Sequence, residues 1–256
     1  MSISRKRTYN KNLIEEKAFS LIELAAVITI VGFLIAVIVT GKSLMNAATI
    51  HSVASNMERY KESVLVFEKI YKSLPGDMSD AYEYWGADCA VSAVKCNGNG
   101  DELVAPATNG DVVEQFMAWK HLSLAELISD RIYSGDDSGG IILGETIPLS
   151  EFDNAGYWFV NSTSVYGKNG LVFGLGSVGS DLDRFGGAIV PADAERIDYK
   201  IDDGKADDGN LYVSRGIPGV GSICTTKAPS ESAPSSFINH DKTKSCALYY
   251  WMPTSK

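Results

Sequence analysis

A long apolar segment near the N-terminus constrains this chain more than any other feature. Residues 19–41 read FSLIELAAVITIVGFLIAVIVTG and hold a single charged side chain, Glu23. A helix of about 20 apolar residues is long enough to cross the hydrocarbon core of a bilayer. Residues 1–18 hold five Lys or Arg and two Glu, and a basic flank of this kind stays in the cytoplasm. The sequence therefore predicts a single membrane pass, with the rest of the chain outside the cytoplasm.

Two ordinary kinds of segment share this length and this basic flank. A cleaved secretory signal needs small residues at a cleavage site just after the apolar run, and VIVTGKSLMNAA offers only a poor one. A simple signal anchor explains the length and the flanks but gives no reason for Glu23. Because a carboxylate inside a membrane helix costs roughly 2.5 to 3.5 kcal/mol on the milder insertion scales, its presence indicates a function.

The residues around Glu23 resemble a known processing signal. FSLIELAAVITIVGFLIAVI after a short basic leader is similar to the N-terminus of type IV prepilins and of the pseudopilins of type II secretion. This resemblance implies that prepilin peptidase cleaves between Ala18 and Phe19, N-methylates Phe19, and leaves Glu23 at the fifth position of the product. The family usually has Gly before the cut. Ala18 is the next smallest residue, so cleavage is still expected.

The resemblance also implies a role for Glu23 in assembly. Cleavage creates a positive amine on Phe19, with which the Glu23 carboxylate of a neighbouring subunit can pair in the core of a filament. Since a buried charge without a partner is strongly unfavourable, such a pair sets axial register more than it adds stability. The expected partners are copies of this chain, other pilin-like subunits and the peptidase. The expected locations are the inner membrane and then a pilus or pseudopilus in the periplasm or at the cell surface.

Apolar residues continue the helical pattern beyond the membrane segment. A stripe at spacings of three and four residues predicts an amphipathic helix, and its members are Ile50, Val53, Met57, Tyr60, Val64, Phe67 and Tyr71. The LPGD sequence at 74–77 ends the pattern, because Pro75 cannot continue a helix and Gly76 favours a turn. Counted from residue 19, the helix covers about 53 residues, or roughly 80 Å.

Residues 74–256 read as a globular α+β head. An amphipathic helix is predicted within residues 111–133, and strands are predicted at 140–149, 156–166, 170–177 and 210–217, separated by Gly, Asn and Asp. Segments such as LPGDMSDAYEYWG and WKHLSLAELISDRIYSG are similar to those of a large-headed group of pilin-like proteins, which implies the pilin fold. The predicted divisions are a leader at 1–18, an assembly helix at 19–41, its amphipathic continuation at 42–73, and the head.

Four cysteines, an even number in a chain directed to a membrane, indicate disulfides. Four cysteines allow three pairings. We favour Cys89 with Cys96 and Cys224 with Cys246, because each pair closes a local loop. A zinc site is the alternative, but the sequence has no CxxC pair and its three histidines are scattered.

Two acidic stretches are candidates for binding calcium. Asn97, Asn99 and Asp101 alternate as in the first half of a calcium loop, but the sixth position is Glu102 and the twelfth is Thr108, where the motif has Gly and Glu. The second stretch, KIDDGKADDGN, contains Asp202, Asp203, Asp207 and Asp208. A solvated turn is the alternative interpretation of this second stretch. Calcium is the one cofactor that the sequence raises.

Composition and motifs argue against other functions. The formal net charge is −9. Without the basic leader, residues 1–18, the remaining chain is more acidic still, and it lacks the clustered Lys and Arg that bind nucleic acid. The histidines lie near no nucleophile motif, so we do not expect an enzyme. The alternative to a structural filament subunit is a rare tip or adhesin-like subunit, or a membrane-anchored binding protein, whose aromatics contact a ligand; the candidates are Trp85, Trp158 and Trp251.

Overall fold

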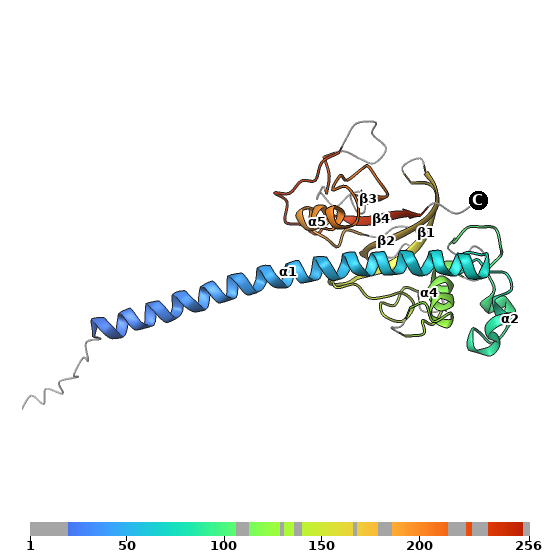
Figure 1. The fold of residues 1–256 in the computed structure, drawn as a ribbon, viewed down its shortest axis with the longest axis horizontal. Coiled ribbons are helices and arrows are strands. Elements are labelled where there is room, and N and C mark those ends of the chain that lie inside the picture. Colours follow the sequence, from blue (N-terminus) through green and yellow to red (C-terminus); the bar gives the residue numbers. More distant parts are fainter. Residues whose placement is uncertain are drawn as a thin grey trace, which may run out of the picture. The chain divides into compact units, whose positions relative to one another are not determined.

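The computed structural model describes residues 20–105, 113–128, 131–135, 140–165, 168–178, 186–214, 224–226 and 235–252. Its helices are α1 (Leu21–Tyr71), α2 (Ala81–Trp85), the short 3-10 helix η1 (Gly86–Asp88), α3 (Ala93–Cys96), α4 (Glu114–Leu124) and α5 (Pro191–Ile201). Its strands are β1 (Ala155–Val165), β2 (Lys168–Ser177), β3 (Leu211–Ser214) and β4 (Ala247–Met252) (Figure 1). The chain forms two compact units, residues 1–46 and 47–256.

Within the second unit, α1 contributes one side of the hydrophobic core. Six of the seven predicted stripe residues are buried, and Tyr71 at the end of the helix is partly buried. Tyr60 lies at the centre of this contact. Its ring is 5.0 Å from that of Trp119 on α4 and 5.2 Å from that of Tyr157 on β1, in edge-to-face arrangements. Rings in this geometry attract each other beyond the area that they bury, so Tyr60 fixes α1 against both a helix and the sheet.

The end of α1 is set by local backbone chemistry. Lys72 takes a left-handed conformation with φ of 59°, the usual way to end a helix. Gly76 follows with φ of +89°, and a Cβ there would lie 2.3 Å from the backbone oxygen of Glu114. The LPGD segment therefore ends the helix as expected and brings the chain into close contact with the start of α4.

The sheet has four antiparallel strands in the order β1-β2-β4-β3. Residue pairs such as Phe159 with Phe173 and Phe173 with Tyr250 define its register. β1, β2 and β3 overlap the strands predicted at 156–166, 170–177 and 210–217. The prediction of a strand at 140–149 is wrong, because in its described residues that segment forms turns and isolated bridges. β4 was not predicted, although it pairs with both β2 and β3.

A glycine allows close packing across β1 and β2. Gly174 lies directly opposite Trp158, and a Cβ at Gly174 would lie 2.6 Å from the Trp158 ring. Trp158 also meets the ring of Tyr249 on β4 edge to face at 5.9 Å. The indole is consequently buried, with 2% of its surface exposed.

The helices of the head differ in part from the prediction. Among the described residues of 111–133, the helix α4 covers Glu114–Leu124. The apolar face predicted for this helix was Phe116, Trp119, Leu122, Leu127 and Ile128, of which all are buried except Leu127, which is partly buried. α5 was not predicted as a helix. It begins with Pro191 at its first turn, a favourable position for Pro, and it buries Ala194 and Ile197. A long N-terminal helix and a small antiparallel sheet confirm the α+β class.

Candidate functional site

The first part of α1 is the candidate assembly segment, defined here as residues 20–45. Large apolar side chains are exposed on all sides of it, including Leu21 at 87% and Phe33 at 69% exposure. By length and composition, α1 is able to cross a membrane. An apolar surface this extensive is unstable in water. The segment therefore requires a lipid environment or the apolar surface of other helices.

Glu23 caps the start of α1 in the isolated chain. Its Oε2 accepts a hydrogen bond of 2.9 Å from the backbone N–H of Ser20, and the Ser20 hydroxyl accepts one from the backbone N–H of Ile22. This arrangement resembles a capping box, in which Ser and a Glu three residues later satisfy the unpaired donors of a helix start. The S-x-x-E spacing from Ser20 to Glu23 is a sequence signal for such a cap. Glu23 thus has a local structural role in capping the helix. A test of any role in assembly has to distinguish it from this cap.

The predicted cleavage site lies outside the described residues. Ala18 and Phe19 precede Ser20, the first residue that the structure describes. Cleavage before Phe19 would leave Ser20 and Glu23, the two residues of the cap, in the product.

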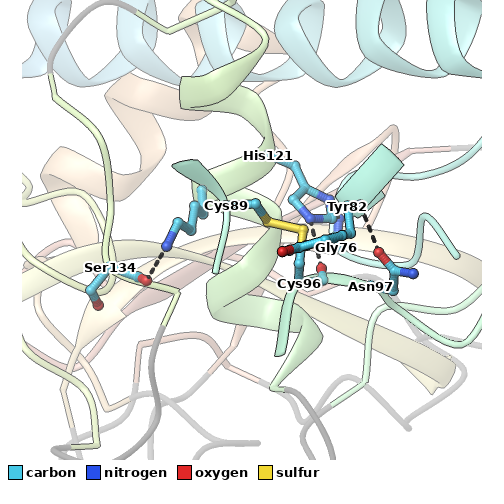
Figure 2. Close-up of a disulfide and its surroundings, with 8 residues drawn as sticks. Gly76, Tyr82, Cys89, Cys96, Asn97, His121 and Ser134 are labelled. Atoms are coloured by element: carbon cyan, nitrogen blue, oxygen red, sulfur yellow. Dashed lines mark hydrogen bonds between the residues drawn. A yellow bond between two sulfur atoms is a disulfide. The ribbon is translucent and has the colours of Figure 1, made fainter. Parts of the chain in front are cut away.

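Both disulfides have the pairing that the short loops favoured: Cys89 with Cys96 and Cys224 with Cys246. All four cysteines are thereby used. Zinc binds cysteine as the thiolate, so sulfurs in disulfide bonds are not ligands for it. The first disulfide lies beside His121, whose ring links two loops (Figure 2). Its Nδ1 accepts a hydrogen bond from the backbone N–H of Gly76 at 3.0 Å, and its Nε2 donates to the Cys96 carbonyl at 3.0 Å.

The first calcium candidate forms part of a cluster that the sequence did not show. Asn97 Oδ1 accepts a hydrogen bond from the backbone N–H of Tyr82 (Figure 2), so this oxygen already joins the loop to α2. Asn99 and Asp101 bond to each other. Asp101 instead lies with two buried carboxylates, Asp77 and Glu114, with one oxygen from each within 4.8 Å of the others.

Backbone donors engage both oxygens of each of the two buried carboxylates in this first cluster. Asp77 accepts from the backbone N–H groups of residues 100, 101 and 102, and Glu114 accepts from those of residues 99 and 105. Burial raises the pKa of Asp77 to about 6, although these N–H groups act in the opposite direction. Burial also raises the pKa of Glu114. The two carboxylates explain the shape of the 97–105 loop as internal hydrogen-bond acceptors, without an ion.

The second calcium candidate contains a residue that sequence reasoning missed. Oxygens of Asp202 and Asp203 lie within 4.8 Å of one from Asp198, in the last turn of α5. Burial and the nearby carboxylates of Asp203 and Asp202 raise the pKa of Asp198 to about 7. The spacing of four residues between Asp198 and Asp202 was an available signal, because it places both on one helix face, but it required α5 to be recognised.

The other two acids of that stretch have separate roles. Asp207 Oδ2 accepts from the backbone N–H of Ser235 at 2.7 Å. Asp208 pairs with Lys205 at 3.0 Å on the surface. Neither belongs to the group of three converging carboxylates.

The three tryptophans proposed to contact a ligand are all at least partly buried. Trp158 is buried in the sheet and cannot contact a ligand, so its candidacy was wrong. Trp85 and Trp251 are partly buried and pack against the core. Among the described aromatics of residues 47–256, Tyr84 and Tyr199 are the more exposed side chains.

Comparison of the chain with protein-family models, with curated proteins and with solved structures finds no match.

Proposed function

We propose that this chain is a structural filament subunit of the type IV pilin and type II pseudopilin class. Prepilin peptidase matures it at Phe19, the inner membrane holds it by the assembly segment, and it polymerises through that segment with copies of itself or related subunits. The head carries the pilin fold outside the cytoplasm.

The assembly segment is the observation that carries this proposal. It combines the Phe-Ser-Leu-Ile-Glu-Leu sequence and its basic leader with a helix whose apolar side chains are exposed on all sides. A plain anchor explains the apolar surface, and in such an anchor Glu23 has only its capping role. A subunit that leaves the bilayer for a filament explains both the surface and a carboxylate near its start, since helix-to-helix packing then replaces lipid and the carboxylate meets an amine.

Processing is tested first, by mass spectrometry of the chain purified from its own cells. We expect a mature chain that begins with N-methylated Phe19, because the leader ends in the small residue Ala18. A chain that retains Met1 would leave a membrane-anchored protein and would contradict the proposal.

Filament yield from Glu23 variants separates charge pairing from helix capping. Gln also serves at the third position of a capping box, so Glu23→Gln retains the cap and removes the charge, whereas Glu23→Ala removes both. We expect both variants to insert and to be cleaved, and both to lose most filament yield. Thr29→Ala is the matched control, because Thr29 is a polar residue of the same segment whose hydroxyl donates to the Ala25 carbonyl of its own helix.

Full filament yield from Glu23→Gln together with loss in Glu23→Ala would show that the cap is what matters, and normal yield from both would contradict an assembly role.

The abundance of the chain in purified filaments decides between a structural subunit and a tip or adhesin-like subunit. A structural subunit dominates the preparation, whereas a tip or adhesin-like subunit is rare.

A further inference from the structure

Asp198 is a buried carboxylate with an unsatisfied oxygen. Its side chain is on the last turn of α5 and has 0% of its surface exposed. Oδ1 accepts a hydrogen bond from the backbone N–H of Gly204 at 3.0 Å, whereas Oδ2 has no hydrogen-bond partner among the described residues. Native proteins satisfy nearly all buried polar atoms, and an exception requires an explanation such as a missing ion.

The positions of the neighbouring carboxylates suit a shared cation. One oxygen each of Asp198, Asp202 and Asp203 lies within 4.8 Å of the other two. Calcium binds oxygen ligands at about 2.4 Å, so two ligands of one ion lie at most about 4.8 Å apart. Three like charges at this separation repel one another unless a proton or a cation intervenes.

The loop between α5 and β3 holds Asp202 in a fixed position. Its Oδ2 accepts from the backbone N–H groups of Asn210 and Leu211. The chain passes so close that a Cβ at Gly209 would lie 2.0 Å from this oxygen. A ligand held by two backbone donors loses little conformational freedom when an ion binds.

The nearby lysine neutralises the outer part of the cluster. Lys205 Nζ lies 3.2 Å from Asp203 Oδ2 and 3.0 Å from Asp208 Oδ2, and its side chain is largely exposed. Exposed pairs of this kind contribute little and exchange readily. The ammonium group can therefore leave Asp203 when a more strongly held cation arrives, whereas Asp198 Oδ2 has no donor among the described residues.

We propose that Asp198, Asp202 and Asp203 bind one calcium ion at the junction of α5 and β3. All three are hard oxygen ligands, which calcium prefers, and water or backbone carbonyl groups supply the remaining positions of its shell. The ion joins the end of α5 to the loop that leads into the edge strand β3, so binding stabilises this part of the head.

Thermal unfolding and calorimetric titration of the full chain in detergent test this site. After removal of metal with a chelator, we expect calcium to bind with one ion per chain and to raise the melting temperature, because a ligand that binds the folded state stabilises it. Magnesium at the same concentration supplies equal ionic strength but demands tighter octahedral geometry, so its effect should be smaller.

Conservative variants identify the ligands. Asp198→Asn and Asp203→Asn keep side-chain shape and should each raise the calcium Kd by about tenfold or more, because affinity depends on the ligand charge. Asp203 is partly exposed, so its variant tests the site even if Asp198→Asn folds poorly. Asp101→Asn is the matched control, because it removes one carboxylate from the other three-carboxylate cluster, and it should bind calcium as the unmodified chain does.

Three results would overturn the proposal. The first is no binding at about 10 mM calcium, which is tenfold above the Kd of about 10⁻³ M of weak protein sites. The second is a magnesium effect equal to that of calcium, which indicates general screening. The third is unchanged binding in both Asp198→Asn and Asp203→Asn, or a loss confined to Asp101→Asn, which assigns any ion to another place.

Discussion

At the level of single residues, the imidazole of His121 is held neutral by its surroundings. Burial lowers its pKa from 6.5 to about 4. With Nδ1 accepting from Gly76 and Nε2 donating to Cys96, the neutral ring satisfies both loops at once, and a protonated Nδ1 would break the first of these bonds. His121 thus links the LPGD turn to the loop closed by the first disulfide.

His121 makes the stability of the head depend on pH. The unfolded chain binds this proton more readily than the folded chain, so the contribution of the neutral ring is fully present above about pH 6.5 and is lost as the pH falls through the folded pKa of about 4. At about 1.4 kcal/mol per pKa unit, the loss is about 3 kcal/mol. It should appear in denaturant unfolding as a pH-dependent difference between the unmodified chain and His121→Gln.

The stability difference between the unmodified chain and His121→Gln cancels the contributions of other titrating groups. Raised pKa values at Asp77 and Asp198 favour folding as the pH falls, and they act equally in both chains. If the stability difference between the two chains stays constant from pH 7 to about pH 4, His121 is not the responsible group.

At the level of elements, α1 is held to the head by a few large side chains. Phe67 is fully buried, and its ring lies 4.5 Å from that of Tyr71 and 6.2 Å from that of His121. Residues of the opposite face, such as Leu65 at 39% exposure, make fewer contacts. The helix is therefore held by its stripe rather than by its overall hydrophobicity.

Truncation on the two faces of α1 should have unequal effects. Phe67→Ala removes a buried ring and leaves a cavity, so we expect a loss of about 3 to 5 kcal/mol in the free energy of unfolding. Leu65→Ala should change it by about 0.5 kcal/mol or less. Tryptophan fluorescence during urea unfolding of the full chain in detergent measures both. Similar losses from the two variants would contradict the assigned packing of α1.

At the level of the whole molecule, the two compact units differ in the solvent that they require. The first unit exposes apolar side chains throughout its described helix, whereas the second has a buried core and an acidic surface. Apolar surface drives transfer from water, and net charge keeps a protein in it.

Phase separation in a cloud-point detergent tests this difference. The full chain should enter the detergent-rich phase, and a chain that starts at Ala47 should stay in the aqueous phase with its core stripe from Ile50 to Phe67 intact. A shortened chain that folds but enters the detergent phase would show that the head itself has a membrane-binding surface.

Local patterns accounted for much of the fold. The stripe in α1, the end of that helix at LPGD, three of the four strands and the two short disulfide loops depend on residues close together in the chain. Periodicity and turn residues report such structure directly. The incorrect strand at 140–149 and the unrecognised β4 show the limit, because strand formation depends on a distant partner more than on intrinsic preference.

The sequence by itself determined the apolar N-terminal segment, its charged position at Glu23 and the amphipathic helix that follows, because each is a periodic or contiguous property of one stretch. Only the tertiary structure decided which carboxylates meet. Glu114 reaches Asp77 and Asp101 because α4 packs beside the LPGD turn, and Asp198 meets Asp203 because the chain turns back after α5. Convergence of side chains depends on how elements pack in space, and no local pattern of residues records that packing.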